Sequence, residues 1–323
     1  MIIALIVFIL SLAVVVKSAD LFLGAAEKTG VYLKIHSFIL GVVLVGFGTS
    51  LPELTTSIAA VVNGQYDITI PNIVGSNIAN ILLIIGLCTV ILGTIRFEKN
   101  LIDLDLPLLL STVFIFGLLA FDGTLSRLDG GLLLVSFFGY ILYSLFYNER
   151  QEYHRGLTKL IFALSKSSST PPRQAADKPS PATYIILVVS VIMLGLASKF
   201  AVDSLLQIVA QVNIAVSVIS FFALAIGTSL PELTVSLKAL KKGQGDVLIG
   251  NIIGSCMFNM LLIGGVASLL HPQTLAMDKG VWMLAGMGIS ALLLLASGIT
   301  KRIHIWEGAA LIVVYIAIGM HIV

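Results

Sequence analysis

The residues best suited to chemistry lie in a hexapeptide, Gly-Thr-Ser-Leu-Pro-Glu, that occurs twice, at 48–53 and 227–232. Each copy places one carboxylate, Glu53 or Glu232, and two hydroxyl side chains inside an apolar run. An ionisable side chain at membrane depth is energetically costly and usually functional. Two such acids in the same local sequence therefore indicate a shared ion site.

The proline of each hexapeptide predicts a break in a membrane helix. Pro52 has no N–H, so the carbonyl of Gly48 loses its helical partner and the ring opens that turn. Irregular backbone inside a membrane persists only where it faces protein or a hydrated cavity. Carbonyls, hydroxyls and a carboxylate together form an all-oxygen environment, which suits Ca²⁺ and Na⁺ rather than zinc or copper.

Other polar residues share helix faces with these groups. Ser50 and Glu53 are three positions apart, and Ser76 and Asn80 in the next apolar run are four apart. The second copy repeats these relations with Thr228, Ser229, Glu232, Ser255 and Asn259. Two converging carboxylates match one divalent cation, and in the empty site their repulsion lets protons compete. Flanking neutral oxygens suit monovalent ions.

The hexapeptide belongs to a longer internal repeat with an offset of 179 residues. Asn72-Ile73-x-Gly75-Ser76 matches Asn251-Ile252-x-Gly254-Ser255, and no gap is needed from Gly48 to Gly86. The chain is therefore two copies of one unit. The copies occupy 1–147 and 183–323, and the polar, Ser- and Pro-containing stretch 148–182 is the linker between them.

The composition indicates an all-α integral membrane protein. Hydrophobic residues make up 58% of the chain and charged residues 11%, against about 25% charged in soluble domains. Ten apolar segments are long enough to cross a hydrocarbon core of about 30 Å, five in each copy: 2–25, 36–61, 69–93, 104–121, 129–147, 183–209, 214–240, 247–270, 280–298 and 305–322. The net charge of +2 gives no reason to expect nucleic acid, and the two cysteines suggest neither a disulfide nor a metal site.

Lys and Arg are distributed unevenly between the two sets of loops. One set, which includes the linker, carries nearly all of them, whereas the opposite loops carry only Arg127 and Lys279. This places the linker in the cytoplasm and both termini outside the cell membrane. Because five is an odd number of spans, the two copies enter the membrane from opposite sides, which is the inverted-repeat arrangement of many secondary transporters. Lys17 and Asp20 are expected to form a local ion pair or to snorkel.

The paired motifs resemble the two α-repeats of the sodium/calcium exchanger family of cation antiporters. Beside the hexapeptides, the resemblance rests on Gly75-Ser76-Asn77-Ile78-Ala79-Asn80 and Gly254-Ser255-Cys256-Met257-Phe258-Asn259, and it covers essentially the whole chain. The short linker is similar to that of prokaryotic members. The resemblance implies ten transmembrane helices in two inverted five-helix repeats, Na⁺/Ca²⁺ exchange, and alternating access by sliding of the first and sixth helices.

The resemblance also implies roles for individual residues. It assigns Ca²⁺ to Glu53 and Glu232, helped by backbone oxygens of Thr49 and Thr228. It assigns Na⁺ to the side chains of Ser50, Ser76, Ser229 and Ser255 and to the carbonyls of Gly46 and Ala225. Asn80 and Asn259 line the middle of the site. Two positions depart from the family pattern, since Asn259 stands where many members carry Asp and Cys256 replaces the usual Asn.

Several functions remain open at this level. A proton/calcium antiporter or a potassium-dependent sodium/calcium antiporter could use the same fold, and a cation channel could use the same acids. The spans contain no paired Asp, no Ser–His arrangement and no HExxH motif, so no enzyme activity is expected. We expect Na⁺ and Ca²⁺ as transported ions and the lipid bilayer as the surroundings, with no cofactor and no obligate protein partner.

Overall fold

The computed structural model describes residues 2–33, 35, 37–98, 105–144, 178–210 and 229–322. The first half contains long helices interrupted by short π-helical segments, labelled η: α1 (Ile2–Tyr32), α2 (Ser37–Ile39), η1 (Leu40–Gly46), α3 (Phe47–Thr49), α4 (Leu51–Val62), α5 (Thr69–Ile78), η2 (Ala79–Ile84), α6 (Ile85–Leu92), β1 (Ile95–Arg96), α7 (Asp105–Leu119), β2 (Thr124–Leu125) and a helix over 127–144. The second half has the same character: α9 (Pro181–Ala210), α11 (Leu230–Lys241), α12 (Gly245–Met257), η3 (Phe258–Ile263), α13 (Gly264–Leu270), β3 (Gln273–Thr274), α14 (Met277–Gly298), β4 (Arg302–Ile303) and α15 (Ile305–Ile322).

The helices are long and apolar enough for a multi-pass membrane protein. Among the described residues, six stretches qualify by length and hydropathy: Ile3–Tyr32, Ser37–Val62, Thr69–Leu92, Pro181–Ala201, Gly245–Leu270 and Met277–Gly298. Two further apolar helices, Asp105–Leu119 and Ile305–His321, are shorter. The expected span 214–240 is described only from residue 229, and most of the linker lies outside the described residues.

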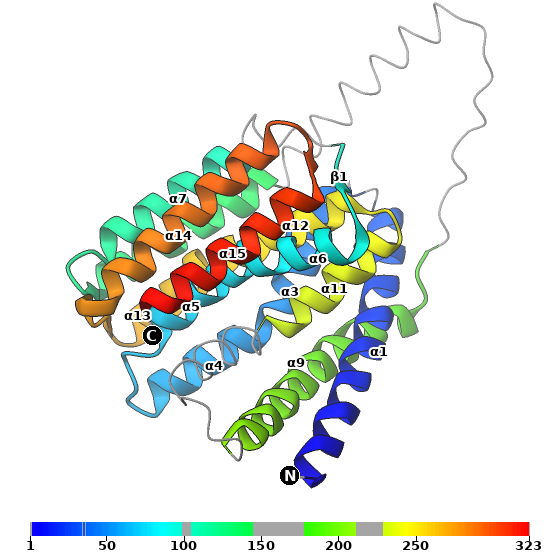
Figure 1. The fold of residues 1–323 in the computed structure, drawn as a ribbon, viewed down its shortest axis with the longest axis horizontal. Helices are drawn as coiled ribbons and strands as arrows, with labels where there is room; N and C mark the ends of the chain where they lie inside the picture. Colours follow the sequence, from blue (N-terminus) through cyan, green and yellow to red (C-terminus); the bar gives the residue numbers. More distant parts are fainter. Residues whose placement is uncertain are drawn as a thin grey trace, which may run out of the picture.

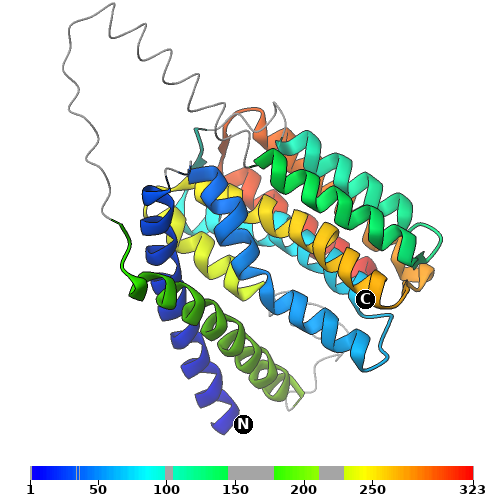
Figure 2. The ribbon, with the colours of Figure 1, turned by 180° about the vertical axis from the view of Figure 1, so that it is seen from behind.

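The helices form a central group flanked on two sides. At one side α1 and α9 pack along each other, and at the other side α7, α14 and the helix over 127–144 lie together (Figures 1 and 2). The most apolar windows of Thr69–Leu92 and Gly245–Leu270 are 89% and 94% buried, against 28% for that of α1. The third and eighth expected spans therefore form the centre of the molecule, which is where the repeated motifs lie.

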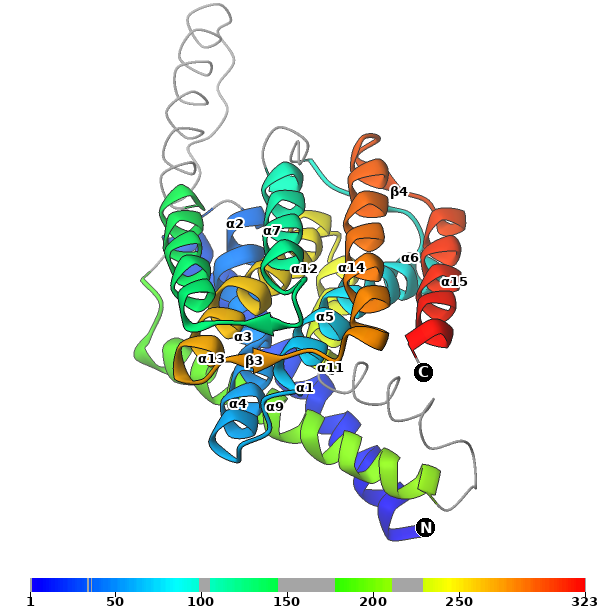
Figure 3. The ribbon, with the colours of Figure 1, turned by 90° about the vertical axis from the view of Figure 1, so that its left-hand side faces the viewer.

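Two short strand pairs connect distant parts of the chain. β1 pairs with β4, in the register Ile95↔Ile303, and β2 pairs with β3, in the register Thr124↔Thr274. The pairs lie at opposite ends of the helices, and both chain ends lie toward the β2–β3 end (Figure 3). Each pair joins a residue of the first copy to one of the second, so the two copies are fastened together at both ends.

Glycines let the broken helix approach the centre closely. A Cβ on Gly41 would lie 3.0 Å from the Cα of Gly250, and a Cβ on Gly254 would collide with the backbone of Val42. Gly250 and Gly254 form a Gly-x-x-x-Gly spacing, which allows membrane helices to pack backbone against backbone. This contact between η1 and α12 brings the hydroxyl of Ser255 to the carbonyl of Gly46.

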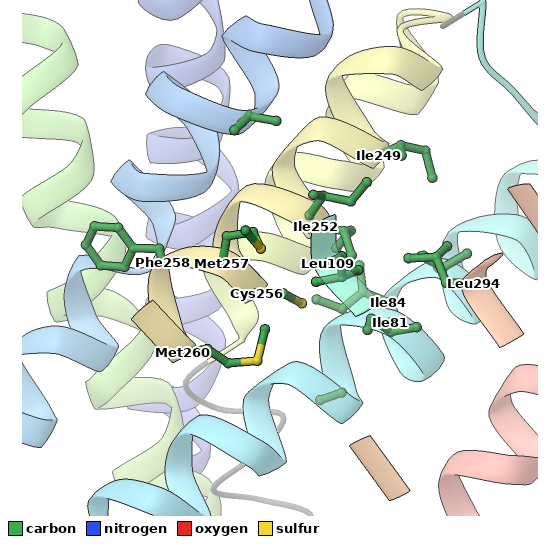
Figure 4. Close-up of a cluster of buried hydrophobic side chains, with 14 of the residues drawn as sticks. Ile81, Ile84, Leu109, Ile249, Ile252, Cys256, Met257, Phe258, Met260 and Leu294 are labelled. Carbon is green, nitrogen blue, oxygen red and sulfur yellow. The ribbon is translucent and has the colours of Figure 1, made fainter. Parts of the chain in front are cut away.

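An apolar cluster fills the space beside this contact. Figure 4 shows Ile81 and Ile84 of η2 gathered with Ile252 and Cys256 of α12, and Leu109 of α7 lies among them. All five side chains are fully buried. Because lipid and protein interior are both apolar, such packing mainly fixes the relative position of the helices.

Two ion pairs join α1 to the second copy, and one of them corrects the local pairing expected for Asp20. Its carboxylate pairs with Lys238 at 2.8 Å, and the Glu27 carboxylate pairs with Lys242 at 2.7 Å. The spacing of Lys17 and Asp20 suggested a local pair, but the close packing of α1 on α11 offers Asp20 a partner from the other copy. These pairs tie α1 to the end of α11.

Candidate cation site

Both hexapeptides start a helix at the same position. Ser50 (φ −89°, ψ 6°) separates α3 from α4, and Ser229 (φ −88°, ψ 9°) directly precedes α11. These angles belong to the sparsely populated region between helix and strand. Pro52 and Pro231 lie in the first turn of the helix that follows, where a missing N–H is tolerated. The chain therefore breaks between α3 and α4 ahead of Pro52, as the sequence predicts.

The two acids lie at equivalent places directly after these breaks. Glu53 is in the first turn of α4 and Glu232 in the first turn of α11, with exposed fractions of 1% and 0%. They are near enough to interact electrostatically with each other. The positive end of a helix dipole favours negative charge in its first turn, so each break also stabilises the carboxylate beside it.

Glu232 accepts a hydrogen bond from the first copy. The Ser50 Oγ donates to the Glu232 Oε1 at 3.0 Å, whereas the Glu232 Oε2 has no partner among the described residues. A serine that precedes a helix usually caps its own backbone, but Ser50 makes no such bond. Its hydroxyl faces the other copy instead, which brings the two hexapeptides together.

Glu53 has a different environment. Neither of its carboxylate oxygens has a hydrogen-bond partner among the residues that the structure describes, and the same holds for the hydroxyl of Ser229. Buried polar groups are almost always satisfied, and an exception needs an explanation such as a bound ion. An unpaired carboxylate within reach of a second acid fits a divalent cation as that explanation.

A backbone carbonyl and two hydroxyls meet beside Glu232. The carbonyl of Gly46 accepts from the Ser255 Oγ at 3.1 Å and from the Thr49 Oγ1 at 3.2 Å. The Oγ1 of Thr49 lies 3.4 Å from the Oγ of Ser255. Ser76, the counterpart of Ser255, is 1% exposed. Thr228 and Ala225 were also expected here, but they lie outside the described residues.

The two asparagines expected at the middle of the site lie in π-helical turns. Asn80 is the second residue of η2 and Asn259 the second residue of η3, and π-helical turns often mark functional sites. The Asn259 Nδ2 donates to the Asn77 Oδ1 at 3.2 Å. The Asn259 Oδ1 and both polar atoms of Asn80 lack partners within the described ranges. These free amide oxygens could serve as cation ligands.

Three residues that the sequence analysis did not select belong to this network. The Asn251 Oδ1 accepts from the Thr49 Oγ1 at 3.1 Å, while its Nδ2 donates to the Ser236 Oγ at 3.0 Å and to the Glu232 carbonyl at 3.4 Å. Asn77 is the third, since it holds Asn259. The available signal was the recurrence of Asn251 and Ser236 as Asn72 and Ser57 at the repeat offset.

This fold is that of a multi-pass membrane protein, and at its centre two buried acids lie among hydroxyl and amide side chains. Residues 3–146 and 182–322 match the family model described as "Sodium/calcium exchanger protein", so the chain belongs to that family. This confirms the resemblance carried by the paired motifs.

Individual relatives match over most of their length. The chain is 34% identical to the inner membrane protein YrbG of Escherichia coli (strain K12) over 274 residues, which are 84% of this chain and 81% of YrbG. It is 29% identical to the sodium/calcium exchanger MaX1 of Methanosarcina acetivorans over 336 residues, with 96% of each chain covered. A solved structure of the sodium-calcium exchanger NCX_Mj superposes with a TM-score of 0.78 at 28% identity, covering 98% of this chain and 97% of that one.

Proposed function

We propose that this protein is a secondary antiporter that exchanges Na⁺ for Ca²⁺ across the membrane by alternating access. The observation that carries the proposal is the unpaired carboxylate of Glu53, buried at a helix break and electrostatically linked to Glu232. Two carboxylates neutralise one Ca²⁺, and hard oxygen ligands surround them. Membership of the exchanger family supports the same pair of ions, and so do the names of MaX1 and NCX_Mj as sodium/calcium exchangers.

In this proposal Glu53 and Glu232 bind Ca²⁺, with backbone oxygens of Thr49 and Thr228. The neutral oxygens around them bind Na⁺: Ser50, Ser76, Ser229, Ser255, Gly46 and Ala225. Asn80 and Asn259 line the middle. The network around Gly46 supports part of this assignment, because the Gly46 carbonyl, which accepts from the Ser255 hydroxyl, is also a suitable oxygen ligand for a monovalent cation.

We propose further that the ten spans form two inverted five-helix repeats, 1–147 and 183–323, joined by a cytoplasmic linker at 148–182. The strand pairs support this arrangement. Adding the offset of 179 to Ile95 gives Thr274, and adding it to Thr124 gives Ile303. The pair Ile95↔Ile303 is thereby converted into the pair Thr274↔Thr124. A two-fold axis in the membrane plane that relates the two copies accounts for this exchange. It also accounts for the position of the two strand pairs at opposite ends of the helices.

Alternating access needs an element that can move against the site. Among the six long apolar stretches, those of α1 and α9 are the least buried. The two helices nevertheless contact the helix break around Ser50 directly. A Cβ on Gly48 would lie 2.7 Å from the Phe22 Cζ, and a Cβ on Gly195 would lie 3.0 Å from the Pro52 Cγ. Sliding of α1 and α9 would therefore be transmitted to the hexapeptide, which favours a carrier over a channel.

Proton coupling is the second candidate. The buried Glu53 carboxylate has no protein partner in the described part of the chain, and a proton could neutralise it as well as Na⁺. Uptake of ⁴⁵Ca²⁺ into proteoliposomes separates the candidates when a Na⁺, a K⁺ or a pH gradient is imposed in turn. We expect uptake to follow the Na⁺ gradient. Uptake that follows only the pH gradient would replace sodium by protons, and uptake without any counter-gradient would indicate a channel.

A further inference from the structure

The two halves of the cation site make different hydrogen bonds although their sequences match. The Glu232 half-site comprises Thr49, Ser50, Glu232, Ser236, Asn251 and Ser255. Its counterpart at the offset of 179, the Glu53 half-site, comprises Ser229, Glu53, Ser57, Asn72 and Ser76 among the described residues. Equivalent residues should bond equivalently if the two halves had the same conformation.

The Glu232 half-site is closed by direct hydrogen bonds. Asn251 is at their centre, since it accepts from Thr49 and donates to Ser236 and to the backbone of Glu232. Ser50 adds its bond to the Glu232 carboxylate. Thr49 and Ser50 belong to the broken helix of the first copy, whereas Asn251 and Glu232 belong to the second. The bonds thus join Thr49 of α3 to α12, and Ser50, between α3 and α4, to α11.

Four residues of the Glu53 half-site lack the counterpart bonds among the described residues. The Asn72 Nδ2 and the Ser57 Oγ, which correspond to the donor and acceptor atoms of Asn251 and Ser236, have no partner within the part of the chain that the structure covers. Ser229 and Glu53, the counterparts of Ser50 and Glu232, are likewise unpaired there. These residues are at most 7% exposed, so leaving them unsatisfied is costly.

A bound cation would satisfy only some of these atoms. It could take the oxygens of Glu53 and Ser229 as ligands. The Asn72 Nδ2 is a hydrogen-bond donor and cannot coordinate a cation, so its partner must come from the protein or from water. Its counterpart on Asn251 donates to Ser236 and to the Glu232 carbonyl, which makes Ser57 and the Glu53 carbonyl the matching acceptors.

The two half-sites lie toward different ends of the helices. The loop after α11 reaches the β1–β4 end, where the Glu98 N–H donates to the Asp246 Oδ1 at 3.0 Å. The loop after α4 reaches the β2–β3 end, where the Thr274 N–H donates to the Tyr66 carbonyl at 2.8 Å. The closed half-site therefore leads toward the end that we assign to the cytoplasm, and the unpaired half-site leads toward the outside.

We infer that Asn251 and Asn72 are positioning residues that close the two half-sites in turn. Asn251 closes the cytoplasmic side in the present conformation, and Asn72 bonds to Ser57 and the Glu53 backbone to close the outer side in the opposite one. The inference rests on the proposed alternating access. It adds two asparagines and two serines, none of them proposed ion ligands, that decide which side is shut.

The test compares Asn251→Ala, Asn72→Ala and the double variant with the wild type. Ser290→Ala is the matched control, since among the described residues this buried serine bonds only to the Gly286 carbonyl of its own helix. The apparent KM for Ca²⁺ is measured from each side in right-side-out and inside-out vesicles. An apparent affinity falls with the fraction of protein in the binding-competent state, so the ratio of the two KM values reports the balance between conformations.

Asn251→Ala should lower the cytoplasmic KM and raise the outer one, and Asn72→Ala should do the reverse. We expect the KM ratio to change roughly five-fold or more in each direction, the usual range for couplings of this kind. The double variant should return toward the wild-type ratio, and Ser290→Ala should leave it unchanged. Shifts of both single variants in the same direction, or equal changes on both sides, would overturn the inference.

Hydrogen–deuterium exchange of the purified, ion-free protein provides a readout that needs no transport. Asn251→Ala should speed exchange in α11 and in the first turns of α12, whereas Asn72→Ala should change little in α4 and α5 because the Asn72 Nδ2 has no partner to lose among the described residues. Equal effects of the two variants would contradict the inference. A wild type without Na⁺-driven Ca²⁺ flux would instead overturn the proposed function, so the two failures are distinguishable.

Discussion

The Ser50 hydroxyl donates to the carboxylate of Glu232 at 3.0 Å, although the two residues are 182 positions apart. Each belongs to one of the two hexapeptides, so this bond joins the two copies at their most polar point. Glu53, the equivalent of Glu232, receives no such bond from Ser229. The serine and the glutamate of the hexapeptide therefore make different bonds in the two copies, and this difference determines several of the expected effects.

The carboxylate pair is tested by Glu53→Gln and Glu232→Gln, which keep the shape and remove one charge. We expect each variant to lose nearly all Na⁺-driven Ca²⁺ flux, because one remaining carboxylate cannot neutralise a divalent cation. Glu53→Gln should leave the Tm of the ion-free protein almost unchanged, since Glu53 has no hydrogen-bond partner in the described chain to lose. Wild-type uptake by either variant at equal expression would contradict the assignment.

The sodium positions are tested by Ser76→Ala and Ser255→Ala. These residues supply neutral oxygens, so their loss should weaken the Na⁺ dependence of exchange more than the Ca²⁺ affinity. Ser255 also donates to the Gly46 carbonyl. Ser255→Ala is therefore also expected to lower the free energy of unfolding by roughly 1 kcal/mol, which would be seen as a lower Tm. The measurement is ⁴⁵Ca²⁺ flux as a function of Na⁺ concentration, and an unchanged Na⁺ dependence in both variants would argue against these positions.

Asn77 is expected to position Asn259. Its Nδ2 lies 3.4 Å from the backbone carbonyl of Cys256, which can only accept, so its Oδ1 must face the Asn259 amide. Asn77→Ala should release Asn259, weaken Ca²⁺ and Na⁺ binding measured by calorimetry, and lower stability by about 1–3 kcal/mol. Cys256→Ser is the matched control at the equivalent position of the second copy. Equal effects of the two substitutions would leave Asn77 without a special role.

The backbone contact between η1 and α12 predicts that adding one methyl group there lowers the stability of the protein markedly. Gly254→Ala would drive a Cβ into the backbone of Val42, whereas a Cβ on Gly288 in α14 meets nothing within 4 Å. We expect Gly254→Ala to destabilise the protein by about 1–3 kcal/mol or more, as overpacking usually does. Gly288→Ala should be neutral or slightly stabilising. Thermal unfolding in detergent measures both, and similar Tm values would refute the close approach.

The orientation is tested by single cysteines introduced at Ser168 in the linker and at Val323 at the C-terminal end, in a background with Cys88 and Cys256 replaced. The excess of Lys and Arg in one set of loops predicts that 148–182 lies inside and that both ends lie outside. A membrane-impermeant thiol reagent should therefore label position 323 in right-side-out vesicles and position 168 only in inside-out vesicles. Labelling of both positions from one side would contradict the inverted arrangement.

The sequence by itself determined the class of fold and the main candidates for the site. Prolines at 52 and 231 predict helix breaks because a missing N–H acts locally, and the structure breaks the chain at Ser50 and starts α11 after Ser229. The acids at 53 and 232 were recognisable because burying charge in a membrane is costly wherever the rest of the chain lies. The internal repeat and the paired motifs led to the exchanger family.

Only the tertiary structure decided which atoms meet. The pairing of Asp20 with Lys238 and the position of Asn251 between Thr49 and Ser236 join residues from both copies. Such contacts depend on how η1 packs against α12 and α1 against α11, and no local spacing encodes that packing. The sequence relates the two half-sites as equals, but the fold gives them different hydrogen bonds. Glu232 is bonded by Ser50, whereas Glu53 finds no partner among the described residues.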